Sequence, residues 1–316
     1  MTMSERGENQ PCLVIIVGPT GVGKSGLALE IAEESGGEII SADSMQVYRY
    51  MNIGTAKPTA EERGRVGHHL IDMVDPDGEF NAALFVRDSR RVIERLHHEG
   101  KRIFVVGGTG LYVRALVGGL FAGPGADHEL RDYYHDICDK YGKTYLHGLL
   151  KRRDSRATER IHVNDTVRTI RALEVLESTG KSIVTMQQEH GFKDSVYDYR
   201  IIGLERERGN LYEKIDKRVE QMMAEGLVDE VKELIRMGYG KSLRPMQSMC
   251  YRHIYEYIEG GCDRDEAIRL VKRDTRRYAK RQLTWFKRDV NTTWLDPDNS
   301  FTVRKRIENY FEEHNL

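Results

Sequence analysis

Short hydrophobic runs recur along the chain and predict the strands of a buried parallel sheet. Cys12–Val17 and Ile103–Val106 are continuous apolar runs, as expected for strands that are covered on both faces. Further short strands are predicted at residues 38–42, 68–76 and 199–204. Between the strands, apolar residues recur at helical spacing, as in residues 85–96, so strands and helices alternate. This order predicts an α/β fold in which helices flank a doubly wound sheet.

The pattern changes in residues 122–198, which are charged, rich in tyrosine and without an obvious strand. Asp165 is a suitable N-cap for a helix over residues 166–178, where apolar residues recur at helical spacing. We therefore expect a helical insertion at 122–198. It interrupts a main domain made of residues 11–121 and 199–316.

A long helix is predicted near the end of the chain, over residues 265–288. Basic pairs recur there every four residues, at Lys272-Arg273, Arg276-Arg277 and Lys280-Arg281. Ile268, Val271, Tyr278, Leu283 and Trp285 are expected to pack inward. A solvated helix usually intersperses acidic residues, yet Asp274 is the only one between Lys272 and Arg288. A contact to a phosphate backbone is therefore favoured over a solvated basic face.

The overall composition restricts the class of protein. Charged residues make up 31% and hydrophobic residues 39%, and no apolar run approaches the length of a membrane span. The four cysteines are scattered without a CxxC pair, which argues against a zinc site or a disulfide framework and favours a reducing cytoplasm. Residues 1–10 lack the apolar core of a signal peptide, so a disordered tail is expected. The formal net charge of −1 predicts no polyanion partner by itself.

The clearest chemical signal follows the first strand and fits the phosphate-binding pattern G-x-x-x-x-G-K-[ST]. The matching residues are Gly18, Pro19, Thr20, Gly21, Val22, Gly23, Lys24 and Ser25. The glycines let several backbone N–H groups point at phosphate oxygens, Lys24 adds a positive charge, and the Ser25 hydroxyl can ligate Mg²⁺. An accidental glycine-rich turn is disfavoured, because a strand precedes the loop and a helix follows it. The pattern predicts a P-loop, NTPase-like sheet without specifying the phosphate compound.

Two further strand ends carry polar residues. Asp43 follows the strand at 38–42, and Thr109 follows the strand at 103–106. Because ligands of doubly wound sheets bind outside the carboxyl ends of the strands, both side chains are expected near the phosphate loop. Asp43 could equally cap a turn. His68 and His69 are adjacent on a strand and point to opposite faces, so a metal site there is disfavoured.

Three classes of function are compatible with these residues. A small-molecule kinase would hold a nucleotide on the loop and an acceptor hydroxyl at Asp43. A group-transfer enzyme would bind a diphosphate leaving group there instead. A nucleic-acid-binding protein would use the loop only for regulation. The carboxylate beside the loop argues against the third class, and the basic helix argues against a simple kinase.

Several sequence blocks follow one another in a fixed order along nearly the whole chain. They are Gly18–Ser25, Ser41–Ser44, Tyr48, Asn52–Pro58, Gly107–Tyr112, His162, Asn164-Asp165, Arg171–Glu174 and Lys280–Trp285. In this order they resemble the bacterial tRNA dimethylallyltransferase family. The resemblance implies transfer of a dimethylallyl group from its diphosphate to N6 of the adenine 3′-adjacent to the anticodon of tRNA.

The resemblance also implies roles for individual residues. Lys24, with Mg²⁺ on Ser25, would neutralise the departing diphosphate, and Arg218 matches an arginine directed at the diphosphate. Asp43 matches the carboxylate that receives the amine proton, and Thr109 matches the threonine at the reaction centre. The implied partners are tRNA and dimethylallyl diphosphate, and we expect a cytoplasmic monomer with no membrane contact.

The resemblance further places contacts to tRNA, because the adenine must leave its stack to react. By alignment the contacting residues are Asp43, Ser44, Met45, Gln46, Thr109, Arg131, Val167, Arg168, Thr169, Ile170, Arg171, Gln247, Ser248, Met249, Cys250, Tyr251 and Arg252. The chain departs from the family pattern on this side. Cys250 stands where the family usually has glycine, and Val163 and Thr166 replace the usual prolines.

Overall fold

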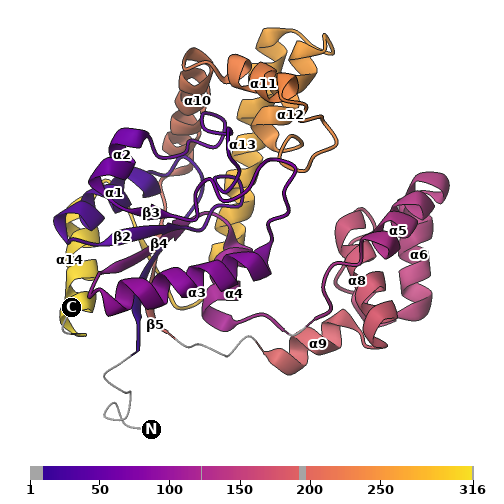
Figure 1. The fold of residues 1–316 in the computed structure, drawn as a ribbon, viewed down its shortest axis with the longest axis horizontal. Coiled ribbons are helices and arrows are strands. Elements are labelled where there is room, and N and C mark those ends of the chain that lie inside the picture. Colours follow the sequence, from indigo (N-terminus) through magenta and orange to yellow (C-terminus); the bar gives the residue numbers. More distant parts are fainter. Residues whose placement is uncertain (1–9, 122, 192–196, 315–316) are drawn as a thin grey trace. The chain divides into compact units, whose positions relative to one another are not determined.

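The computed structural model describes residues 10–121, 123–191 and 197–314, drawn as a ribbon in Figure 1. The chain divides into two compact units, each with its own internal contacts. The first contains residues 1–117 and 196–316, and the second contains residues 118–195. The predicted tail lies outside the described residues except for Gln10.

The first unit is built on a six-stranded parallel sheet. Its strands are β1 (Cys12–Val17), β2 (Glu38–Ser41), β3 (His68–His69), β4 (Ile103–Gly107), β5 (Asp198–Leu204) and β6 (Thr292–Leu295). The spatial order is β3-β2-β4-β1-β5-β6, and every neighbouring pair is parallel. All six residues of β1 are buried, as the continuous apolar run predicts. The predicted α/β parallel sheet is confirmed.

The strand order places the binding crevice. From β1 the chain moves to one side to form β2, β3 and β4, and later crosses to the other side to form β5 and β6. The carboxyl end of β1 therefore lies where the direction of winding reverses, which is where ligands of open α/β sheets bind.

Helices surround this sheet. They are α1 (Lys24–Glu34), α2 (Ala60–Arg65), α3 (Ala82–His98), α4 (Gly110–Gly118), α10 (Arg208–Ala224), α11 (Leu227–Arg236), α12 (Met249–Ile258), α13 (Arg264–Phe286) and α14 (Ser300–Glu312). Val14 and Ile16 of β1 share one hydrophobic cluster with residues of α1, α10 and α14. Helix α3 contacts β2 and β4. Helices therefore pack against the sheet that carries the predicted site loops.

The prediction of a strand over residues 68–76 was wrong beyond its start. Strand β3 ends at His69, and Leu70 and Asp72 adopt left-handed φ angles of 61° and 56°. His69 Nε2 lies 2.7 Å from Glu38 Oε2, so this histidine is engaged in an internal contact. The chain bends at residues 70–72, and Val74 then forms an isolated parallel bridge with Tyr48.

The inward face predicted for the long basic helix is confirmed in part. The buried residues of α13 are Ala267, Val271, Thr275, Ala279, Gln282 and Phe286. Of the predicted set Val271 is buried and Leu283 packs against the main hydrophobic core, while Ile268, Tyr278 and Trp285 remain partly exposed. Helix α13 packs against α10 and α12, and small buried residues let these helices approach closely.

The second unit is helical throughout its described residues. It contains α5 (His128–Tyr141), α6 (Lys143–Arg153), α7 (Ser155–Thr158), α8 (Thr166–Thr179) and α9 (Ile183–His190). Asp165 caps α8 as predicted, because its carboxylate accepts a hydrogen bond from Arg168 N at 3.1 Å. Tyr134, Leu146, Leu150 and Leu173 belong to a separate hydrophobic core. The region between α4 and β5 is thus helical as expected, but Asp198, which the sequence placed in the insertion, already belongs to β5.

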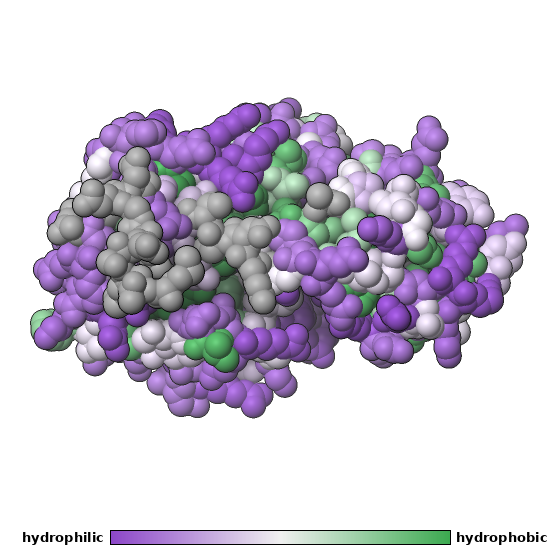
Figure 2. All heavy atoms as spheres, turned by 90° about the horizontal axis from the view of Figure 1, so that it is seen from below, coloured by the Kyte–Doolittle hydropathy of each residue, from purple (hydrophilic) through white to green (hydrophobic). Residues whose placement is uncertain are grey.

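Across the residues that the structure describes, none of the helices is both long and apolar enough to cross a bilayer. Figure 2 shows one face of the molecule, on which hydrophilic side chains cover most of the area and hydrophobic ones form small patches.

Candidate active site

The predicted phosphate loop connects β1 to α1 and curls as the sequence requires. Gly18 and Gly23 have φ angles of 146° and 109°, which only glycine adopts readily. A Cβ atom on Gly18 would lie 2.5 Å from the carbonyl oxygen of Leu204. Gly23 is the N-cap of α1 and offers no side chain to cap it, so the first N–H groups of the helix are available to an anion.

Lys24 folds back over the loop. Its amine donates to the carbonyl oxygens of Gly18 at 2.9 Å and Pro19 at 2.8 Å. The pKa of Lys24 is lowered to about 7, mainly by burial and also by the charge of Arg218, while the charge of Asp43 opposes the shift. Two cations and one carboxylate therefore act on one another at the mouth of the loop.

The loops that carry Asp43 and Thr109 are locked together. Thr109 N donates to Ala42 O at 3.2 Å, and Ser44 N donates to Thr109 Oγ1 at 3.0 Å. This approach requires glycine at 107, since a Cβ atom there would lie 2.1 Å from Ala42 O. Asp43 Oδ1 also accepts a bond from Met45 N at 2.8 Å, so Asp43 caps a turn as well. Asp43 can therefore cap this turn and also lie near the phosphate loop, the two roles that the sequence allowed.

Arg218 reaches the same region from α10. Burial lowers its pKa, and the nearby carboxylate of Asp43 opposes that shift. The Asp43 carboxylate thus interacts electrostatically with both Lys24 and Arg218, which lie on different helices. The geometry gathers Lys24, Asp43, Thr109 and Arg218, which come from four separate parts of the sequence, at one edge of the sheet.

Two residues of α13 to which the sequence assigned no role in the site also reach this edge. Gln282 accepts a hydrogen bond from Thr20 N at 2.8 Å and donates one to Gly108 O at 3.0 Å. Burial raises the pKa of Tyr278 to about 12, with the nearby charge of Asp43 adding to it. Gln282 lies in the block Lys280–Trp285 named in the sequence analysis, but that block gave it no individual role.

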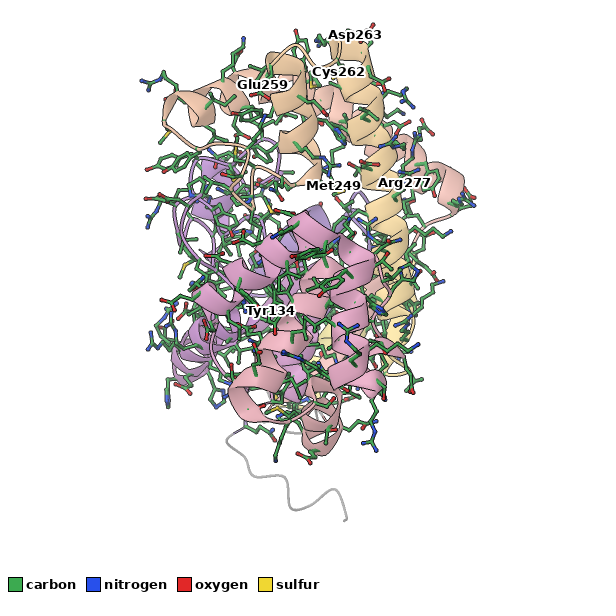
Figure 3. All side chains as sticks on the ribbon, turned by 90° about the vertical axis from the view of Figure 1, so that its right-hand side faces the viewer. Tyr134, Met249, Glu259, Cys262, Asp263 and Arg277 are labelled. Atoms are coloured by element: carbon green, nitrogen blue, oxygen red, sulfur yellow. The ribbon has the colours of Figure 1, made fainter. Side chains whose placement is uncertain are left out.

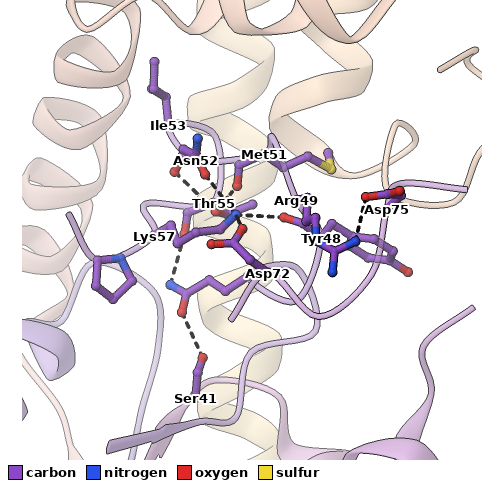
Figure 4. A network of polar contacts seen from close by, with 12 residues as sticks. Ser41, Tyr48, Arg49, Met51, Asn52, Ile53, Thr55, Lys57, Asp72 and Asp75 are labelled. Carbon is purple, nitrogen blue, oxygen red and sulfur yellow. Dashed lines mark hydrogen bonds and ion pairs between the residues drawn. The ribbon is translucent and has the colours of Figure 1, made fainter. Parts of the chain in front are cut away.

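The loop between β2 and α2 is supported by buried polar contacts, shown in Figure 4. The Lys57 amine donates to Tyr48 O at 2.7 Å, Asn52 Oδ1 at 2.9 Å and Asp72 Oδ1 at 2.6 Å. The Lys57 side chain is only 1% exposed. The Gln46 amide accepts from the Ser41 hydroxyl at 2.8 Å and donates to Ala56 O at 3.1 Å. Gln46, one of the predicted tRNA contacts, therefore uses its side chain internally.

The predicted contact segment Gln247–Arg252 spans the start of α12, where Figure 3 labels Met249. Tyr251 is buried and donates to Glu230 at 2.6 Å. Burial raises the pKa of Cys250 to about 11, which keeps its thiol protonated. Arg252 is half-exposed and pairs with Asp274 at 3.1 Å. Arg252 is thus the member of this segment that is placed to meet an external anion.

The basic residues of α13, and Arg288 just beyond its end, fall into three groups. Lys272 pairs with Glu220 at 2.6 Å, and Arg276 pairs with Asp216 at 3.0 Å, both acids lying on α10. Arg273 and Arg277, the latter labelled in Figure 3, contact Asp274. Within the described residues no acidic partner meets Lys280, Arg281 or Arg288, and these three line an open cavity together with Thr284 and Trp285.

In the second unit, most of the predicted contact residues are internally bound. Glu174 is fully buried and accepts from Arg131 Nε at 2.9 Å, Arg171 Nη1 at 2.6 Å and Asp127 N at 2.7 Å. Thr169 and Ile170 are buried in the helical core. Val167 is 75% exposed, and the Arg168 side chain is 66% exposed. Of the tRNA contacts predicted on α8, these two are the residues whose side chains are mostly exposed.

Comparison with known proteins decides the family. A sequence model of the IPP transferase family matches residues 46–289. The chain belongs to the IPP transferase family. The "tRNA dimethylallyltransferase 2" of Syntrophus aciditrophicus is 55% identical over 290 residues, which cover 92% of this chain and 93% of the relative.

Two solved structures are similar to this IPP transferase family protein. A full-length tRNA isopentenylpyrophosphate transferase from Bacillus halodurans has 41% identity and a TM-score of 0.72, covering 97% of this chain and 98% of that one. A eukaryotic dimethylallyltransferase acting on tRNA has 28% identity and a TM-score of 0.77, covering 90% and 73%.

Proposed function

We propose that this IPP transferase family protein transfers a dimethylallyl group from dimethylallyl diphosphate to N6 of the adenine 3′-adjacent to the anticodon of tRNA. The donor loses its allylic C–O bond and releases diphosphate, while a new C–N bond forms at N6. The observation that carries this proposal is the meeting of an anion-binding loop and the Asp43 carboxylate at one edge of the sheet. The curated relative and the solved structures named above support the same reaction.

The residues divide the reaction between two ends of the site. The phosphate loop, Lys24 and Arg218 hold the diphosphate, whose negative charge grows as the C–O bond breaks. Asp43 accepts the proton that N6 loses, and general-base catalysis of this kind contributes about 10²–10⁴-fold. Thr109 fixes the Asp43 loop through its bond from Ser44 N.

Mg²⁺ fits the phosphate loop with few protein ligands. The described residues hold no cluster of three or more histidine, cysteine or acidic side chains that could bind a metal. Mg²⁺ usually takes only one or two protein oxygens and completes its shell with substrate phosphates and water. The Ser25 hydroxyl at the start of α1 would supply such an oxygen. Bound there, Mg²⁺ would neutralise charge on the leaving diphosphate.

For tRNA, the proposal uses cations whose side chains reach solvent. Arg168 of the second unit and Arg252 of α12 are exposed although each also pairs with an acidic residue, and Lys280, Arg281 and Arg288 at and just beyond the end of α13 are exposed as well. Phosphate contacts from such side chains provide affinity, and the adenine must be unstacked to reach the site. The protein is proposed to act as a cytoplasmic monomer.

Labelled dimethylallyl diphosphate tests this function directly. Incubated with an unmodified anticodon stem-loop RNA and Mg²⁺, the full chain should place label in the RNA. A matched RNA with guanine instead of the target adenine should stay unlabelled. Consumption of the γ-phosphate of ATP with a small acceptor, and no label in RNA, would replace the transferase proposal with a kinase.

A further inference from the structure

Glu230 of α11 occupies an unusual position, because its carboxylate receives four hydrogen bonds from two distant segments. Asn52 N and Ile53 N donate to Oε2 at 2.8 and 2.7 Å. Gly54 N donates to Oε1 at 3.0 Å, and the Tyr251 hydroxyl donates to the same oxygen at 2.6 Å. Successive backbone N–H groups that converge in this way form an anion-binding concavity, filled here by the protein's own carboxylate.

Steric contact reinforces the same junction. A Cβ atom on Gly54 would lie 2.6 Å from the Tyr251 ring, so glycine at 54 is what lets the ring reach Glu230. Burial raises the pKa of Tyr251 well above 10, and the charge of Glu230 adds to this shift. The phenol therefore stays protonated and continues to donate.

The junction connects to the active-site loop through buried contacts. Asn52 accepts from Lys57 through its side chain, and Gln46 donates to Ala56 O a few residues away. A displacement of Asn52 would therefore be transmitted to the segment that carries Asp43 and Gln46. On its other side, the buried Tyr251 precedes the half-exposed Arg252 in the first turn of α12.

We propose that Glu230 is a positioning residue for tRNA. It fixes the Asp43–Gly54 loop against the start of α12, and so keeps a constant distance between the groups of these two segments that contact tRNA. This inference rests on the proposed function and extends it to a residue that touches neither substrate. The phosphate loop lies outside the junction, so Glu230 acts on the RNA and not on the prenyl donor.

Replacing Glu230 with glutamine tests the role while keeping the side-chain volume. The glutamine NH₂ group would face N–H or O–H donors, so part of the four-bond junction is lost. We expect the KM for the anticodon stem-loop RNA to rise about tenfold, as loss of charge-assisted bonds implies. The KM for dimethylallyl diphosphate should stay within about twofold, since the phosphate loop is untouched.

Matched controls lie on the same elements. Glu233→Gln changes an exposed carboxylate of α11 that pairs only with Arg236, and should leave both KM values unchanged. Gly54→Ala disrupts the junction at the segment that donates to Glu230, and should raise the KM for RNA as Glu230→Gln does. Gly64→Ala, whose added Cβ meets nothing within 4 Å, serves as its control.

Parallel rises in both KM values, or a fall in kcat and melting temperature with neither KM changed, would show a merely structural role and overturn the inference. If Glu230→Gln fails to fold, Tyr251→Phe removes only the phenol donor and should still raise the RNA KM selectively. If the wild-type chain transfers no prenyl group, the proposed function itself fails. Equilibrium RNA binding by the same variants then decides the role of Glu230, with unchanged affinity in Glu230→Gln overturning it.

Discussion

Replacing Gln282 with alanine should damage both stability and turnover, because this side chain joins two active-site loops. Its amide bonds Thr20 N in the phosphate loop and Gly108 O beside Thr109. The side chain is only 6% exposed, so its loss leaves a backbone donor and a backbone acceptor without partners in a buried place. Sequence alone does not reveal this link, since the bonded residues are more than 170 positions away.

The magnitude follows from the two orphaned groups. Each buried polar group left unsatisfied costs about 1–3 kcal/mol, and water entering the vacated space offsets part of this. We expect the free energy of unfolding to fall by about 2–4 kcal/mol. A shift of the phosphate loop relative to Thr109 by about 1 Å can cost roughly 100-fold in rate, so turnover at saturating substrate should fall by 10- to 100-fold.

Urea denaturation and single-turnover prenyl transfer measure these two effects on the same preparation. Thr284→Ala is the matched control, because the Thr284 hydroxyl bonds only Lys280 O within its own helix. A Gln282→Ala variant with the denaturation midpoint and transfer rate of the wild type would refute the proposed link between the loops.

Two further variants test other parts of the structure. Glu174→Gln should remove an acid-sensitive contribution to stability. Burial raises the pKa of Glu174, but the hydrogen bonds from Arg131 and Arg171 have the larger combined effect and hold this pKa below 4.5. The wild type should therefore lose this stabilisation as the pH falls below 4.5, and the variant should not, as denaturation across that pH range would show. Lys280→Glu combined with Arg281→Glu should reduce the slope of log affinity for RNA against log salt by about 2. An unchanged slope would show that this end of α13 is a solvated face that does not contact RNA.

The central strands were predicted well because the burial of a strand is visible in its amino-acid sequence. Strands β1 and β4 are covered on both faces, so they appear as continuous apolar runs. Strand β6 was missed, since its four residues are only partly buried and lie at the edge of the sheet. An edge strand carries too little hydrophobic pattern to be distinguished from a loop.

The site was predicted only where local sequence specifies it. The phosphate loop and the two strand ends that carry Asp43 and Thr109 follow from spacing and from the geometry of parallel sheets. Gln282 and Glu230 act through contacts between segments far apart in the chain, and no local pattern encodes such contacts. The acidic partners of the basic helix were missed for the same reason, because Asp216 and Glu220 lie on α10.

The most direct test of the central claim is single-turnover prenyl transfer by Asp43→Asn, measured together with the affinity for dimethylallyl diphosphate. Asparagine keeps the shape of the side chain and its bond from Met45 N, but it cannot accept the amine proton. The transfer rate should fall by about 10²–10⁴-fold, while the donor binds as tightly as in the wild type. Transfer at the wild-type rate would contradict the role of Asp43 as the proton acceptor beside the phosphate loop.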